Sequence, residues 1–259
     1  MERSVVAAAI QFNIALGDID TNVGYARGAV ARAAAAGARL AVLPEMWATG
    51  FAYRELPRLA MRTPEVLEEV GRLSAEHGMV IVGSLPEPQG DKICNTAYVV
   101  DRGQLVGKYR KIHLFSLMGE DRSLIGGDSW LVADTSVGRI GVFICYDLRF
   151  PELARRLSVE GADILVVPGE WPKPREEHWR TLLRARAIEN QLFVVAANCC
   201  GVTGKLDFFG SSLIVGPKGE LLAEGGYAPG ELVATLDFAD MAAWRQQITC
   251  YQDRKPEYY

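Results

Sequence analysis

The chain has 259 residues, of which 49% are hydrophobic and 23% charged, and its formal net charge is −4. This composition is ordinary for a globular protein, and the small negative charge gives no sign of a nucleic acid or an anionic membrane as partner. The sequence has no apolar run of the ~18 residues that a membrane span needs, and its first residues lack a signal-peptide pattern. We therefore expect a cytoplasmic protein.

Strand-like and helix-like segments alternate along the first half of the chain. Helical patterns cover residues 22–36 and 63–77, the first with Thr21 or Asn22 as its cap and the second closed by Gly78. Strand-like composition is found at residues 5–12, 40–43, 79–83, 94–100 and 104–108. The last two of these segments flank an Asp-Arg-Gly sequence, which predicts a tight hairpin turn.

The second half repeats this alternation after an irregular, polar stretch at residues 115–129. A connection of that length without structure of its own usually covers a functional site. Strands are predicted at residues 130–133, 139–144, 164–167, 192–198, 208–215, 220–223 and 231–236, and helices at 151–159, 176–190 and 238–247. The segments 208–215 and 220–223 are expected to pair. No linker or tandem repeat interrupts the order, so residues 1–259 are interpreted as a single α/β domain.

The five cysteines are irregularly spaced, and their odd number argues against a disulfide framework. The three histidines are scattered, so we expect no metal site and no cofactor. One cysteine stands apart, because Cys145 follows the hydrophobic segment 139–144 and opens a sharp turn. A thiol at such an elbow can be held rigid, and the backbone amides of the turn can point at a developing oxyanion.

Two further polar side chains follow strand-like segments. Glu45 comes after Pro44, which cannot donate to a central ladder and so marks the end of the strand at 40–43. Lys111 lies in a basic stretch that follows the strand at 104–108. Each residue alone is most often a solvated charge, whereas the ordered series Glu, Lys, Cys is a stronger signal.

The segments around these three residues resemble the motifs of the nitrilase superfamily, the carbon–nitrogen hydrolases. Glu45 lies in Leu-Pro-Glu-Met-Trp-Ala-Thr-Gly-Phe, Lys111 in Tyr-Arg-Lys-Ile-His-Leu-Phe and Cys145 in Ile-Cys-Tyr-Asp-Leu-Arg-Phe-Pro-Glu. The resemblance implies a four-layer αββα sandwich and hydrolysis through a cysteine thioester. It implies that Cys145 is the nucleophile and Glu45 the base, and that Lys111 and the backbone N–H of Tyr146 bind the oxyanion.

Residues 170–191 resemble the omega-amidase branch of that superfamily, which hydrolyses the side-chain amide of small 2-oxo dicarboxylate monoamides. Glu120 matches a second glutamate described in the family, although its neighbour Asp121 is a rival for that role. Such a substrate carries a carboxylate and needs a basic partner. The candidates for substrate binding are Trp171, Arg149, Lys173 and Arg175.

One residue departs from this resemblance, because Glu170 stands where we expect a small residue. The alternatives within the superfamily are a nitrilase and an N-carbamoyl hydrolase. A non-catalytic binding protein on the same fold is the alternative from another class. The family is commonly oligomeric, so a homodimer is expected, with the aromatic tail at residues 252–259 docked on the partner.

Overall fold

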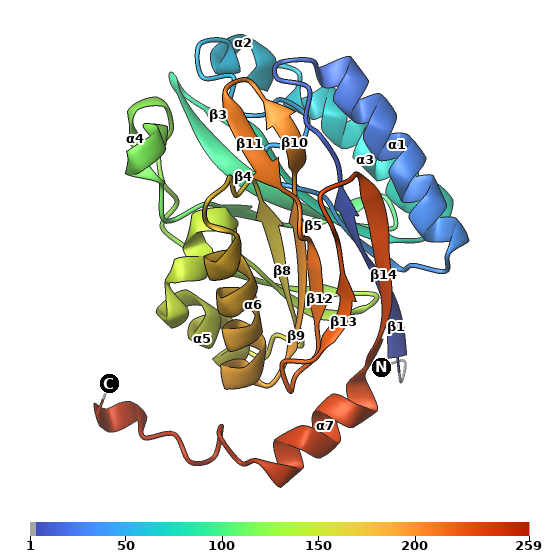
Figure 1. The fold of residues 1–259 in the computed structure, drawn as a ribbon, viewed down its shortest axis with the longest axis vertical. Coiled ribbons are helices and arrows are strands. Elements are labelled where there is room, and N and C mark those ends of the chain that lie inside the picture. The colour runs from blue at the N-terminus through green and yellow to red at the C-terminus, as the bar shows by residue number, and fades with distance from the viewer. Residues whose placement is uncertain (1–3, 259) are drawn as a thin grey trace.

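The computed structural model describes residues 4–258, which form two six-stranded sheets packed together (Figure 1). The first sheet has the order β14 (Gly230–Asp237), β1 (Ser4–Gln11), β2 (Leu40–Val42), β3 (Val80–Gln89), β4 (Lys92–Asp101) and β5 (Gln104–Arg110). The second has the order β6 (Leu131–Thr135), β7 (Gly138–Val142), β8 (Ile164–Gly169), β9 (Phe193–Asn198), β12 (Leu213–Val215) and β13 (Leu221–Glu224). The two sheets have the same pattern of strand pairing. In the orders given, the first two strands are antiparallel, the next two pairings are parallel, and the last two are antiparallel.

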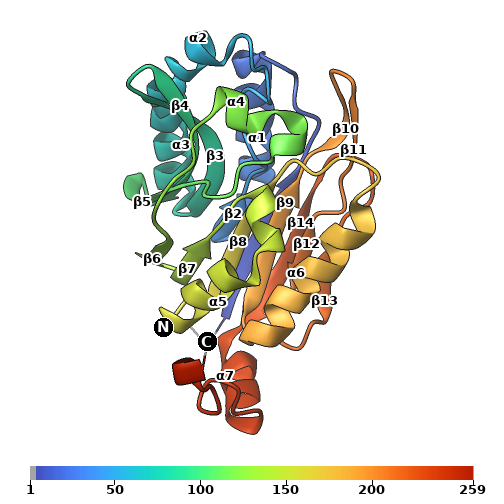
Figure 2. The same ribbon diagram turned by 90° about the vertical axis from the view of Figure 1, so that its left-hand side faces the viewer.

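Helices cover the outer face of each sheet (Figure 2). Helices α1 (Ile19–Ala35) and α3 (Thr63–His77) lie on the first sheet, and α5 (Pro151–Val159) and α6 (Glu176–Asn190) lie on the second. This arrangement confirms the expected αββα sandwich. Helix α7 (Phe238–Gln247) and the C-terminal segment extend beyond the sheets, ending in the short helix η3 (Pro256–Tyr258).

The alternation of side chains along β1 explains why each sheet can be buried on both faces. Ala7 and Ala9 belong to the apolar cluster that includes the strands of the second sheet. Ala8 and Ile10 point the other way and belong to the cluster that includes α1 and α3. Successive strand residues face opposite sides of a sheet, so a continuous apolar strand is buried between two layers.

One predicted strand is wrong. Residues 208–215 do not form a single strand, because β11 (Leu206–Phe209) pairs with β10 (Cys200–Thr203) in a separate two-stranded sheet while β12 pairs with β13. The chain turns between β11 and β12 at Gly210 and Ser211, whose φ angles of +69° and +50° are left-handed. A strand cannot continue through that backbone conformation.

Most other predicted boundaries differ from the observed ones by a few residues, but the strand predicted at 79–83 extends to Gln89 in β3. Helix α1 begins at Ile19, and its cap is Asp18, which accepts a hydrogen bond from the backbone N–H of Thr21. The stretch at 115–129 is not wholly irregular, because it contains the short helices η1 (Ser116–Met118) and α4 (Glu120–Ser123). The short helix α2 (Leu56–Ala60) was not predicted.

In the part of the chain that the structure describes, we find no helix long and apolar enough to cross a membrane.

Candidate active site

The candidate site lies at the ends of strands from both sheets. Glu45 follows β2 of the first sheet, and Cys145 follows β7 of the second, at the start of the short helix η2 (Cys145–Arg149). The backbone N–H of Glu45 donates to the carbonyl of Gly169 at 3.3 Å, which ties the end of β2 to the end of β8. Lys111 directly follows β5 of the first sheet. The sandwich therefore brings together residues that are 100 positions apart in the chain, Glu45 and Cys145.

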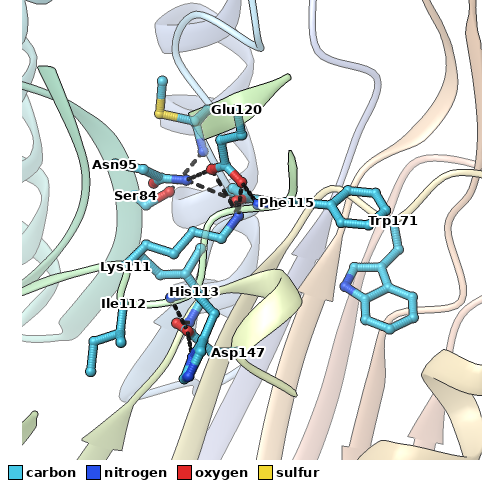
Figure 3. Close-up of polar contacts among 12 residues, drawn as sticks. Ser84, Asn95, Lys111, Ile112, His113, Phe115, Glu120, Asp147 and Trp171 are labelled. Carbon is cyan, nitrogen blue, oxygen red and sulfur yellow. Dashed lines mark hydrogen bonds and ion pairs between the residues drawn. The ribbon is translucent and has the colours of Figure 1, made fainter. Parts of the chain in front are cut away.

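The ammonium group of Lys111 is held by two carboxylates (Figure 3). Its Nζ atom donates to Oε1 of Glu45 at 2.8 Å and to the two carboxylate oxygens of Glu120 at 2.8 and 2.7 Å. The Nδ2 atom of Asn95, on β4, also donates to Oε1 of Glu45 at 2.8 Å. Glu120 is further fixed by the backbone N–H of Phe115, which donates to its Oε2 at 2.7 Å. This network lies out of solvent, with only 1% of the Lys111 side chain exposed.

Burial and the neighbouring charges set the protonation states of this network. Burial alone would lower the pKa of Lys111, but Glu45, Cys145 and Glu120 together raise it well above its ordinary value. Burial raises the pKa of Glu45, and the charge of Glu120 raises it further, against the opposing effect of Lys111. Lys111 is therefore a permanent cation in a site shielded from water, and Glu45 is a stronger base than an exposed carboxylate.

Cys145 has the strained backbone of a nucleophile elbow. Its φ angle is +48°, in the left-handed region that non-glycine residues rarely adopt, and 8% of the residue is exposed. Burial and the charge of Glu45 raise the pKa of its thiol well above the ordinary value, while Lys111 and the backbone N–H of Glu170 act in the opposite direction. The resting residue is therefore a thiol, and a base must remove its proton as the sulfur attacks.

The two carboxylate oxygens of Glu45 differ in their hydrogen bonds. Its Oε1 is occupied by Lys111 and Asn95, whereas its buried Oε2 accepts no hydrogen bond of good geometry from any described residue. Glu45 and Cys145 nevertheless lie close enough to shift each other's pKa. Oε2 is thus the oxygen of Glu45 that neither Lys111 nor Asn95 engages.

Asp147, two residues after Cys145, anchors the elbow. Its Oδ2 accepts from the backbone N–H of Ile144 at 2.9 Å and from the hydroxyl of Tyr109 at 2.7 Å. Its Oδ1 accepts from the backbone N–H of His113 at 3.0 Å, and Nδ1 of His113 lies 2.7 Å from the same oxygen. One buried carboxylate therefore joins the elbow in the second sheet to the segment on either side of Lys111.

Two cavities meet at Cys145. The first, which we call the inner cavity, is lined by Glu45, Lys111 and Glu120 and by aromatic residues that include Tyr53. The outer cavity is lined by residues that include Tyr146, Trp171, Arg149, Arg175 and Pro172. The two cavities share the lining residues Phe115, Met118, Cys145 and Glu170.

The outer cavity contains most of the predicted substrate-binding candidates. The guanidinium of Arg149 lies over the Trp171 ring, 4.8 Å from its centroid, and that of Arg175 lies 5.3 Å from the centroid of the Phe115 ring. Lys173 is different, because its Nζ atom pairs with Asp207 at 2.9 Å and it does not line this cavity. We therefore do not retain Lys173 as a candidate for substrate binding.

The family model described as carbon–nitrogen hydrolase matches residues 6–246. The chain belongs to the carbon–nitrogen hydrolase family. A 2-oxoglutaramate amidase from Bacillus subtilis is 36% identical over 96% of this chain and 97% of its own length. Omega-amidase NIT2 from Homo sapiens is 33% identical over 92% of this chain and 91% of its own length.

Solved structures give the same family. A mutant of the amidase from Nesterenkonia sp. AN1, which carries the acetamide moiety of fluoroacetamide on its active-site cysteine, has a TM-score of 0.88 and 29% sequence identity. The match covers 100% of this chain and 97% of that one. The resemblance to the nitrilase superfamily is thereby confirmed, and this protein is a carbon–nitrogen hydrolase with the fold expected for it.

Two site residues of this hydrolase were not predicted. Asn95 lies beside another polar residue, Thr96, in a largely apolar strand, and only the pairing of β4 with its neighbours places it beside Glu45. Asp147 lies within the motif around Cys145, where an acid in a largely apolar turn could have indicated an anchoring role. Glu120, rather than Asp121, points into the network, and Asp121 is exposed.

We expect Asp147→Asn to lower kcat by about tenfold or more, because a small displacement of a reacting group is costly and can reach ~10²-fold for 1 Å. The variant presents an amide N–H₂ to groups that now donate to a carboxylate, so the elbow and the lysine segment should separate slightly. The measurements are kcat and the rate at which iodoacetamide alkylates Cys145. Asp121→Asn is the matched control, as an exposed acid outside the network.

A lowered melting temperature with unchanged kcat and unchanged alkylation of Cys145 would contradict this positioning role. In that case Asp147 would only stabilise the fold.

Proposed function

We propose that this carbon–nitrogen hydrolase is an omega-amidase, which converts a small 2-oxo dicarboxylate monoamide to the dicarboxylate and ammonia. Hydrolysis of an amide carbon–nitrogen bond follows from the family and from relatives named as amidases. The observation that favours a substrate with both an amide and a carboxylate is the position of Cys145 between two cavities. One cavity holds the Glu–Lys–Glu network, and the other is lined by Arg149 and Arg175.

We propose the following roles in the first half of the reaction. The sulfur of Cys145 attacks the amide carbon, forming the C–S bond while Oε2 of Glu45 takes the thiol proton. The carbonyl oxygen becomes an oxyanion, which Lys111 and the backbone N–H of Tyr146 stabilise. Glu45 then returns the proton to the nitrogen, the C–N bond breaks, and ammonia leaves a thioester on the sulfur.

The second half reverses these proton transfers with water as the nucleophile. Glu45 removes a proton from the water as the water oxygen attacks the thioester carbon. Glu45 then returns that proton to the sulfur as the C–S bond breaks, which regenerates the thiol and releases the new carboxylic acid. Glu120 keeps Lys111 oriented through its two short hydrogen bonds. Because Asn95 and Lys111 occupy Oε1 of Glu45, its carboxyl group cannot rotate away between the two steps.

The proposal is tested by measuring ammonia release from 2-oxo dicarboxylate monoamides, simple aliphatic amides, carbamoyl amino acids and nitriles. An omega-amidase prefers the first group. Carbon dioxide release together with ammonia would identify an N-carbamoyl hydrolase, and turnover of nitriles would identify a nitrilase. If no substrate were turned over and none acylated Cys145, the protein would be a non-catalytic binder.

We expect kcat/KM for an amide with a distal carboxylate to exceed that of its neutral isostere by about 10- to 150-fold. This range corresponds to the ~1.5–3 kcal/mol of a hydrogen bond to a charged group. Arg149→Met should remove most of the difference, because it deletes the charge beside Trp171 while keeping an apolar side chain. Lys173→Met is the control, since Lys173 pairs with Asp207 instead. Equal kcat/KM for the charged and neutral amides would reject the omega-amidase assignment.

We also propose that the protein is a cytoplasmic homodimer whose whole chain forms one domain. The match of the family model over residues 6–246 supports the single domain. The hydroxyl of Tyr251 is hydrogen-bonded to Ser158 and Asn190 of its own chain, so this part of the tail packs on its own subunit. Tyr258 is 81% exposed and is available to a partner, whereas Tyr259 lies outside the described residues. A monomer mass by light scattering would reject the dimer.

A further inference from the structure

The roles proposed so far leave one buried acid unused. Glu170 follows β8, is 5% exposed, and its Oε2 has no hydrogen-bond partner among the residues that the structure describes. A buried polar atom without a partner is costly, and such an atom in a native protein requires an explanation. Glu170 is also the residue that departs from the small side chain expected from the sequence.

The position of Glu170 suggests a substrate as the missing partner. It lines both the inner and the outer cavity, and it shares that property with Cys145, Phe115 and Met118. Its backbone N–H also acts on the thiol of Cys145. A substrate with its amide at Cys145 and its carboxylate at Arg149 would therefore pass along the Glu170 side chain.

The surroundings of Glu170 favour the uncharged form of its carboxyl group. Burial raises its pKa well above the ordinary value, the charges of Glu45 and Glu120 raise it further, and only Lys111 opposes them. Lys111 directs its hydrogen bonds to Glu45 and Glu120. The titratable and charged groups that line the two cavities with Glu170 are Glu45, Tyr53, Lys111, Glu120, Cys145, Tyr146, Arg149 and Arg175.

We propose that Glu170 is a specificity residue, whose carboxyl group donates a hydrogen bond from Oε2 to the 2-oxo oxygen of the substrate. This inference rests on the proposed omega-amidase function and assigns the recognition of its 2-oxo group. The 2-oxo carbon lies next to the substrate carboxylate, on the side of Cys145 that the outer cavity occupies. An uncharged acid pairs with a carbonyl oxygen, whereas an ionised one would favour the ammonium of a 2-amino amide such as glutamine.

The test compares three five-carbon monoamides that differ only at carbon 2, which carries an oxo group, an amino group or no substituent. In the wild type, kcat/KM for the 2-oxo amide should exceed that of the unsubstituted amide by about tenfold, the size of one hydrogen bond in a site built for it. Glu170→Ala should bring that ratio close to one. Glu170→Gln should keep most of it, because its amide N–H₂ still donates. Glu152→Gln, an exposed acid on α5, is the control.

The pH dependence separates a hydrogen-bond role from a merely structural one. As pH rises through the pKa of folded Glu170, the wild-type ratio should fall and turnover of glutamine should rise relative to the 2-oxo amide. The Glu170→Gln ratio should not change with pH. Melting temperatures provide an independent readout, since a raised acid pKa means that wild type loses stability relative to Glu170→Gln as pH rises above the unfolded pKa.

The outcomes distinguish this inference from the proposed function. Turnover of 2-oxo dicarboxylate monoamides with an unchanged ratio in Glu170→Ala overturns the role of Glu170 alone. If Glu170→Ala does not fold, a ratio in Glu170→Gln that still falls with pH overturns it equally. Failure of the wild type on every dicarboxylate monoamide overturns both proposals.

Discussion

Cys145→Ser is expected to fold normally and to show no measurable amide hydrolysis. Serine is nearly the same size as cysteine and places no larger atom in the buried elbow. Its hydroxyl is a far weaker acid than a thiol, so Glu45 cannot remove the proton even with Lys111 nearby. The measurements are ammonia release and the melting temperature.

A matched control and a positive signal sharpen this prediction. Cys250→Ser changes an exposed thiol and should retain full activity. Intact-mass measurement of the wild type with substrate should detect an acyl adduct that disappears in Cys145→Ser. Substantial turnover by the Cys145→Ser variant would contradict the mechanism through a cysteine thioester.

Lys111→Ala should lower kcat by at least ~10²-fold, since loss of one oxyanion donor typically costs ~2.7–4 kcal/mol in the transition state. The substitution should also change the protonation of Glu45. Lys111 lowers the pKa of Glu45, so its removal raises that pKa, and the residual activity should shift to higher pH. Both Glu45 and Glu120 would also lose their buried counter-ion.

The stability of the same variant provides a second measurement. A lysine whose folded pKa is raised stabilises the fold at every pH below its unfolded value, and this contribution is lost only as pH rises through the folded value. Lys111→Ala should therefore melt at a lower temperature than wild type at pH 7. Lys108→Ala is the control, because Lys108 is an exposed lysine on β5 that pairs with Glu87. A near-normal kcat in Lys111→Ala would mean that the lysine is only structural.

The sequence identified the three candidate site residues better than the residues that surround them. Glu45, Lys111 and Cys145 lie in motifs whose flanking residues are informative, and the structure brings all three together. Asn95 could not be predicted in the same way, because a partner across a sheet depends on strand pairing that local sequence does not specify. The predicted strand at 208–215 is wrong for a local reason, since Gly210 and Ser211, two turn-forming residue types, adopt positive φ angles in the middle of it.

The bridge made by Asp147 has a consequence for how the enzyme can lose activity. Glu45 and Lys111, the proposed base and cation, follow strands of one sheet, and Cys145, the proposed nucleophile, follows a strand of the other. The proposed reacting groups are therefore held together by the contact between layers. The small side chains of Ala7 and Ala9 contribute to that contact and let the layers approach closely. A state that kept every strand but loosened the layers would therefore be inert. Turnover thus reports on the packing of the two halves, and neither half could be catalytic alone.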